Sequence, residues 1–79
     1  MDSTTEKSLR KELKLHARAL GIPDGAAEDF INTTIKSVQP TLTKKSTLTP
    51  ADFTRIVAKE LKKYHKDLAY IYEIHNTII

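Results

Sequence analysis

Hydrophobic side chains recur every three or four residues along most of this 79-residue chain, which is the period of helices that bury one face. The first stripe predicts a helix over residues 3–20. Its inward positions are Leu9, Leu13, His16, Ala17 and Leu20. Ser3 and Glu6 form a capping-box signature at the start of this helix, and Gly21 followed by Pro23 marks its end.

A second stripe predicts a helix that starts at Asp24. Its inward positions are Ala27, Phe30, Ile31, Thr34, Ile35 and Val38. Pro40 disfavours helical geometry at Gln39, so we expect the helix to end or kink there, with Leu42 reaching the core only through one loose extra turn. Residues 41–47 are polar and are predicted to form an exposed loop.

The clearest start signal in the chain precedes the third helix. Thr49 is suited to cap this helix, Pro50 to be its first residue, and Asp52 to complete an acidic variant of the capping box. Leu48 and Phe53 stand at the two positions that form a hydrophobic staple. The inward positions of the third helix are Phe53, Ile56, Val57, Leu61 and Tyr64.

The apolar stripe then continues without a glycine or proline. Its further positions are Leu68, Ile71, His75 and Ile78. One unbroken helix over residues 50–79 would be about 45 Å long, which is too long for a core this small unless the chain forms a homodimer. We therefore predict a break at 64–67 and a fourth helix that starts at or near Asp67. Residues 69–79 are rich in β-branched and aromatic side chains, so a terminal strand is the alternative.

Length and composition indicate one small domain over residues 1–79, and the helical spacing predicts that it is all-α, a compact bundle of about four helices. The chain is 39% hydrophobic and 29% charged, and it has no cysteine that could form a disulfide to stabilise so small a fold. The first residues are polar and lack the apolar stretch that a signal peptide needs. The longest apolar run, residues 68–72, is too short to span a membrane. A cytoplasmic location is therefore expected.

Three segments of the second half, 52–57, 60–63 and 68–72, resemble the closing pattern of the helical part of ATP-cone domains. These domains are nucleotide-sensing modules of ribonucleotide reductases and of a bacterial repressor of their genes. The register of the resemblance covers about residues 9–76. It implies a helical regulatory module. The family's β-hairpin, whose basic Lys-Arg-x-Gly segment helps to bind the nucleotide, has no counterpart here, so no cofactor-binding residue is assigned.

Residues with catalytic or metal-binding chemistry do not form a recognisable site in the sequence. His16, His65 and His75 are scattered, and we expect His16 and His75 to be packing residues rather than metal ligands. The chain lacks a Gly-x-Ser-x-Gly motif, a glycine-rich phosphate loop and a cysteine nucleophile. The acidic residues gather at predicted helix starts, where they favour the helix dipole. We expect no enzyme activity, no catalytic residue, no metal and no cofactor.

Basic residues follow two helix faces at steps of four and three. The first face contains Lys7, Lys11, Lys14 and Arg18. The second face contains Arg55, Lys59, Lys62 and Lys66. With a net charge of +3, these faces are either ordinary solvated surfaces or a phosphate-facing surface for nucleic acid or an acidic partner.

Tyr70 and Tyr72 lie 200° apart on a helix, so both cannot face the core. Since Tyr72 follows the apolar stripe, Tyr70 should be exposed or at an edge together with Ile74. The two residues then form either a partner patch or a contact with the first helix. The leading interpretation is a small regulatory module that acts through protein–protein contact. A nucleic-acid-binding module is the alternative, followed by a degenerate ATP-cone-like nucleotide sensor.

Overall fold

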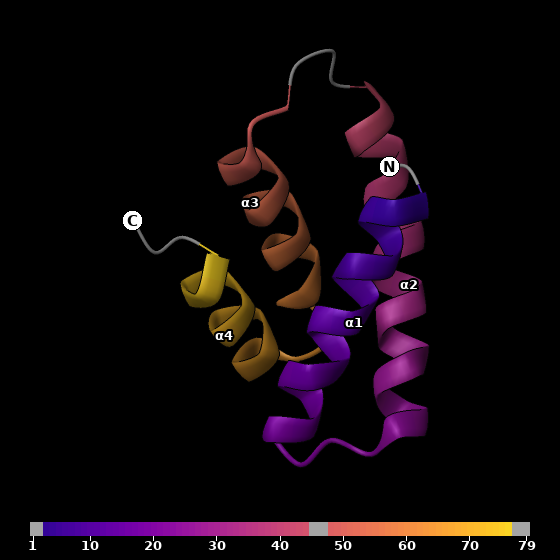
Figure 1. The fold of residues 1–79 in the computed structure, drawn as a ribbon, viewed down its shortest axis with the longest axis vertical. Helices are drawn as coiled ribbons and strands as arrows, with labels where there is room; N and C mark the ends of the chain where they lie inside the picture. The colour runs from indigo at the N-terminus through magenta and orange to yellow at the C-terminus, as the bar shows by residue number, and fades with distance from the viewer. Residues whose placement is uncertain (1–2, 45–47, 77–79) are drawn as a thin grey trace.

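The computed structural model describes residues 3–44 and 48–76, and these residues form four α-helices and no strand (Figure 1). The helices are α1 (Ser3–Ala19), α2 (Asp24–Lys44), α3 (Pro50–Leu61) and α4 (Lys66–Asn76). The predicted small all-α bundle is confirmed. None of these helices is long and apolar enough to cross a membrane.

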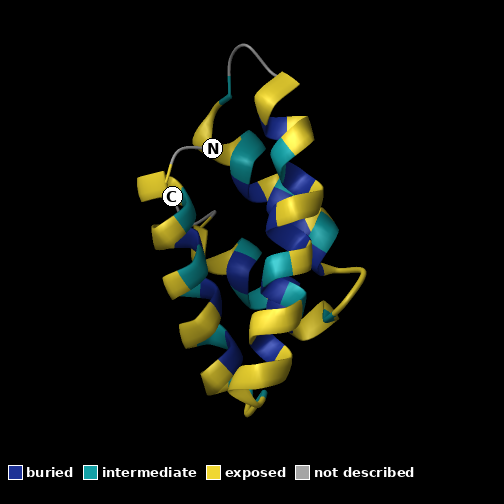
Figure 2. Cartoon of the chain, turned by 90° about the vertical axis from the view of Figure 1, so that its right-hand side faces the viewer, coloured by how far each residue is buried: buried dark blue, intermediate teal, exposed yellow. Residues whose placement is uncertain are grey.

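Each helix buries one stripe and exposes the rest, as Figure 2 shows. Both α1 and α3 pack against α2 and α4 but not against each other, so they occupy opposite corners of the bundle. The shared core consists of Leu9, Leu13, Ala17, Ala27, Ile31, Ile35, Val38, Leu42, Val57, Ala58, Leu61, Leu68, Ala69 and Tyr72. Burial of these side chains is the main force that holds the four short helices together.

At two predicted helix boundaries, the structure has the hydrogen bonds that the residue types indicate. The Thr49 hydroxyl accepts a hydrogen bond from the Asp52 amide at 3.1 Å, which caps α3. Gly21 has a φ of +77°, and the amides of Gly21 and Ile22 donate to the carbonyls of Arg18 and Ala17. This pair of bonds is the Schellman arrangement that ends a helix, and it needs a glycine at the left-handed position.

Of the two outcomes expected at Pro40, an end or a kink of the second helix, the end is wrong, whereas the expectation that Leu42 reaches the core is confirmed. Helix α2 continues through Pro40 to Lys44, so residues 41–44 are helical rather than a loop; residues 45–47 of the predicted loop lie outside the described residues. Pro40 is exposed, whereas Val38 and Leu42 are both buried. Packing of these two side chains on the core outweighs the loss of one backbone hydrogen bond at the proline.

The predicted break before the fourth helix is confirmed, and Asp67 lies in the first turn of α4. The alternative of a terminal strand is wrong for residues 69–76, and Ile78 lies outside the described residues. Tyr64 was expected in the core but is 44% exposed, because α3 ends at Leu61 and the chain turns before Tyr64. The sequence did not indicate that His65 caps α4: its Nδ1 accepts a hydrogen bond from the Leu68 amide at 3.2 Å.

Thr34 provides a test of core packing. Its hydroxyl is buried in α2 and has no hydrogen-bond partner among the described residues. Because an unpaired buried hydroxyl is unfavourable, Thr34→Val, which keeps the shape of the side chain, should raise the free energy of unfolding by about 1 kcal/mol. Urea denaturation measures the change. The exposed neighbour Thr33 is the control, since Thr33→Val should change stability by less than about 0.5 kcal/mol. A less stable Thr34→Val protein would contradict this account.

Candidate functional site: the α3–α4 face

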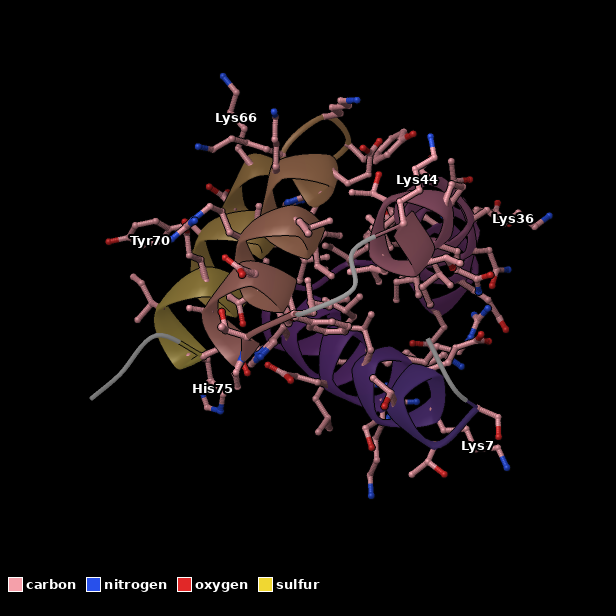
Figure 3. The ribbon with its side chains drawn as sticks, turned by 90° about the horizontal axis from the view of Figure 1, so that it is seen from above. Lys7, Lys36, Lys44, Lys66, Tyr70 and His75 are labelled. Carbon is pink, nitrogen blue, oxygen red and sulfur yellow. The ribbon has the colours of Figure 1, made fainter. Side chains whose placement is uncertain are left out.

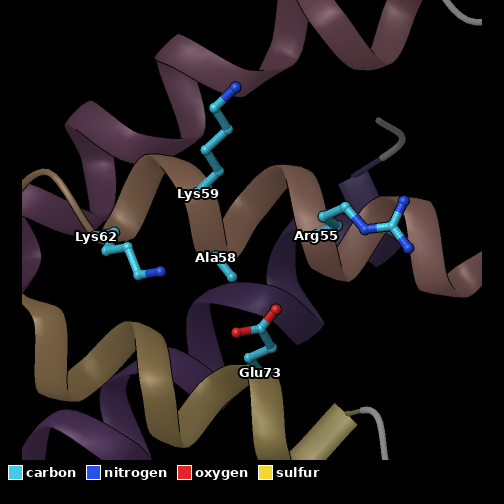
Figure 4. Close-up of a pocket in the computed structure, with 5 residues that line it drawn as sticks. All are labelled: Arg55, Ala58, Lys59, Lys62 and Glu73. Atoms are coloured by element: carbon cyan, nitrogen blue, oxygen red, sulfur yellow. The ribbon is translucent and has the colours of Figure 1, made fainter.

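Three of the predicted basic residues surround one hollow between α3 and α4 (Figure 4). The hollow has a volume of about 200 Å³, and its lining residues are Arg55, Ala58, Lys59, Lys62 and Glu73. The small side chain of Ala58 leaves the space open. Figure 4 shows that Glu73 points from α4 toward Ala58 and that Lys62 extends into the space between the helices, whereas Arg55 and Lys59 point away from it.

Positive charge predominates around this hollow. Arg55 lies 3.7 Å from Asp52, but both side chains are accessible to water, so this ion pair leaves the guanidinium available. Lys59 and Lys62 form no ion pair within the described ranges. One carboxylate, that of Glu73, therefore lies among three cations.

The outward side of α4 continues this surface. Lys66, Tyr70 and Ile74 follow one another at steps of four along the helix, and Tyr70 is 65% exposed and Ile74 44% exposed. Figure 3 shows Lys66 and Tyr70 pointing outward from the bundle. The predicted exposure of Tyr70 and Ile74 is confirmed. We refer to this surface as the α3–α4 face; it consists of Arg55, Lys59, Lys62, Lys66, Tyr70 and Ile74.

The first predicted basic face does not join this surface. Its four residues, Lys7, Lys11, Lys14 and Arg18, are exposed along α1. Figure 3 places Lys7 on the opposite side of the molecule from Lys66 and Tyr70. Lys14 and Arg18 also have acidic neighbours, at 4.0 Å and 3.4 Å, at the start of α2. The structure thus provides two separate basic surfaces. The first lies on the helix that carries the exposed Leu15, and the second lies on the two helices of which α4 carries the exposed Tyr70 and Ile74.

The histidines do not gather into a metal site. His16 and His75 form an edge-to-face ring contact with centroids 5.0 Å apart, and His16 Nε2 lies 3.2 Å from a carboxylate oxygen of Glu12. His16 is half-buried as expected, whereas His75 is exposed. No group of three histidine, aspartate or glutamate side chains in the described part of the chain could hold a metal ion.

Tyr72 is the most strongly perturbed titratable group of the bundle core. It is 2% exposed in α4. Burial, followed by the nearby charge of Glu12, raises the pKa of Tyr72 from 10.0 to about 12, while a hydrogen bond with the Thr54 side chain acts in the opposite direction. The hydroxyl is therefore neutral at physiological pH and serves as a hydrogen-bonding group.

This pKa shift predicts a pH dependence of stability. The unfolded chain ionises Tyr72 near pH 10 and the folded chain only near pH 12, so its stabilising contribution is complete below pH 10 and is lost as the pH rises toward 12. Wild-type protein should therefore lose more stability over this range than Tyr72→Phe, which has no hydroxyl to ionise. Urea denaturation of both proteins at each pH measures the difference, and equal losses would contradict the shift.

The chain matches no protein-family model, no curated protein and no solved structure. The resemblance to the helical part of ATP-cone domains therefore stays a prediction.

Proposed function

We propose that this protein is a non-enzymatic regulatory module that binds another protein through the α3–α4 face. The observation that carries the proposal is the exposure of Tyr70 and Ile74 on α4, the helix that packs against α3 and its exposed cations. Aromatic side chains and arginine are enriched where proteins bind one another, and a partner would remove the apolar area of Tyr70 from water. The likeness to ATP-cone domains agrees with a regulatory role.

The chemistry of the face favours an acidic partner segment that carries apolar side chains. Arg55, Lys59, Lys62 and Lys66 would attract its carboxylates, while Tyr70 and Ile74 would contact its apolar residues. The hollow beside Ala58, at about 200 Å³, can accept one side chain of the partner. An amphipathic helix laid along the groove between α3 and α4 combines these three contacts.

Nucleic acid is the second candidate, because an exposed tyrosine beside cations is also the arrangement on which single-stranded bases stack. The exposed Ile74 beside Tyr70 favours the protein partner, since an aliphatic side chain offers apolar contact but no ring on which a base could stack. We therefore favour the protein partner.

A panel of defined probes tests the proposal. Fluorescent peptides of about 15 residues would include an amphipathic sequence with glutamates and leucines, the same sequence with alanines for the leucines, and the same sequence with lysines for the glutamates. Single-stranded and double-stranded DNA of similar length complete the panel. Only the first peptide should bind well, and its amide shift changes should map to α3 and α4.

Salt separates the candidates. Binding to the acidic amphipathic peptide should weaken when salt rises from about 50 mM to about 300 mM but persist, because its apolar contacts are not screened. Preferential binding of DNA with a steep salt dependence would favour the nucleic-acid candidate. Saturable thermal stabilisation by ATP would instead support nucleotide sensing. Equal binding of the alanine peptide would overturn the role of Tyr70 and Ile74.

A further inference from the structure

A second hollow lies between α1, α3 and α4, away from the α3–α4 face. Its volume is about 210 Å³. Its lining residues are Thr5, Ser8, Leu9, Glu12, Pro50, Phe53, Thr54, Tyr72 and Asn76. Side chains of both α1 and α3 line it, although the two helices occupy opposite corners of the bundle. No lysine or arginine lines it, although the chain has thirteen of them.

Glu12 is the charged residue of this hollow, and its hydrogen-bond partners are a histidine and an asparagine. It accepts hydrogen bonds from His16 Nε2, at 3.2 Å, and from the side-chain amide of Asn76. No lysine or arginine pairs with it among the described residues. Glu6 and Glu60, in contrast, lie 3.1 Å and 3.3 Å from an arginine or a lysine. Glu12 is thus a half-buried carboxylate without a permanent counter-charge.

The other walls suit a ligand with one polar end. Leu9, Pro50 and Phe53 provide apolar surface, and Thr54 and Tyr72 provide hydroxyls that are hydrogen-bonded to each other. The charge of Glu12 reaches this hydroxyl pair, since it contributes to the raised pKa of Tyr72. A hollow with an apolar wall, several hydroxyl oxygens and one carboxylate that has no lysine or arginine partner favours a cation that can donate several hydrogen bonds.

We propose that this hollow binds a small primary ammonium group carried on a short apolar stem. The ammonium pairs with Glu12 and donates to the neighbouring hydroxyl oxygens, while the stem lies against Leu9 and Phe53. Such a group belongs either to a free alkylamine or to a lysine side chain of another protein. The site is independent of the α3–α4 face, so each can fail without the other.

Amide chemical-shift titrations of the full chain with three probes test this site. The probes are n-butylammonium, the neutral n-butanol, and a lysine blocked at both backbone ends. Ionic strength is held constant with sodium chloride. Butylammonium should give saturating shifts at residues 8–12, 53–54 and 72–76, whereas butanol should bind at least about tenfold more weakly because it lacks the charge-assisted contact. Equal binding of butanol, or no saturation with any probe, would overturn the proposal.

Substitution of the carboxylate provides the second test. Glu12→Gln keeps the size of the side chain but should weaken butylammonium binding about tenfold, because a charged hydrogen bond is replaced by a neutral one. Glu28→Gln, which neutralises an exposed glutamate on α2, is the matched control and should leave binding unchanged. An equal effect of both substitutions would overturn the site. If Glu12→Gln does not fold, the comparison of butylammonium with butanol on the wild-type protein decides.

The blocked lysine separates the two sources of the ammonium group. Binding of both butylammonium and the blocked lysine would support a lysine side chain of a protein as the natural ligand. Binding of butylammonium alone would support a free amine, since the backbone of the blocked lysine would then be excluded by the rim of the hollow.

Discussion

Replacement of Leu13 by alanine is expected to destabilise the bundle more than any change to its surface. Leu13 is fully buried in α1, a helix that packs against α2 and α4 alone. Loss of a buried leucine side chain and the cavity that remains should lower the free energy of unfolding by about 3–4 kcal/mol. A chain of this length is expected to have a total stability of only roughly 4–12 kcal/mol, so a substantial unfolded fraction should appear on moderate heating.

The same helix provides the control. Leu15 is 57% exposed, so Leu15→Ala removes an equal number of atoms from a site that buries little apolar surface. Its effect should stay within about 0.5 kcal/mol. Urea denaturation followed by circular dichroism at 222 nm, a wavelength that reports roughly on helix content, measures both variants. Similar losses for the two leucines would mean that α1 does not pack as described.

Loss of Tyr70 and Ile74 is expected to have the largest effect on binding. With the acidic amphipathic peptide as the probe, Tyr70→Ala combined with Ile74→Ala should weaken affinity by about 100-fold, because two apolar contacts at the centre of the interface are lost. Both side chains are exposed in the free protein, so the helix content and the thermal midpoint should change little. Fluorescence anisotropy measures the affinity, and Leu15→Ala, which changes an exposed leucine on α1, is the control.

A contrasting pair of substitutions checks the role of charge. Lys59→Gln with Lys62→Gln should weaken binding mainly at low salt, since exposed cations act through a screened attraction. The same pair on α1, Lys7→Gln with Lys11→Gln, removes an equal charge from a surface that lies elsewhere. An effect of the α1 pair as large as that of the α3 pair would show that net charge, and not the α3–α4 face, determines binding.

The sequence was sufficient to predict a helix boundary wherever the capping residues at that boundary and the packing of the helix favour the same end point. Thr49 caps α3 and Gly21 ends α1 as their residue types indicate. Pro40 shows the opposite case, because the conformational rule for proline is local while the packing of Leu42 on the core is not. A sequence pattern cannot compare the energetic cost of a proline inside a helix with the gain from burying Leu42, because that gain depends on the helices that pack around it.

Spatial neighbours that are distant in sequence could not be predicted. The basic stripe of α3 and the pair Tyr70 and Ile74 were each recognised, but their position on one surface depends on how α3 and α4 pack. The hollow around Glu12 was missed because its walls come from three helices. The sequence offered no signal for it, since Glu12 in a helical pattern resembles any other solvent-facing glutamate.

The short connection over residues 62–65 affects how a partner would be bound. His65 caps α4 through the Leu68 amide, and the backbone amide of His65 also bonds to the carbonyl of Leu61, so the turn is tied to both helices. The backbones that carry the cations on α3 and the apolar pair on α4 are therefore held in a fixed relation before any partner arrives, so little backbone entropy remains to be lost on binding. For such a preorganised surface, the cations should govern the association rate, whereas Tyr70 and Ile74 should govern the lifetime of the complex.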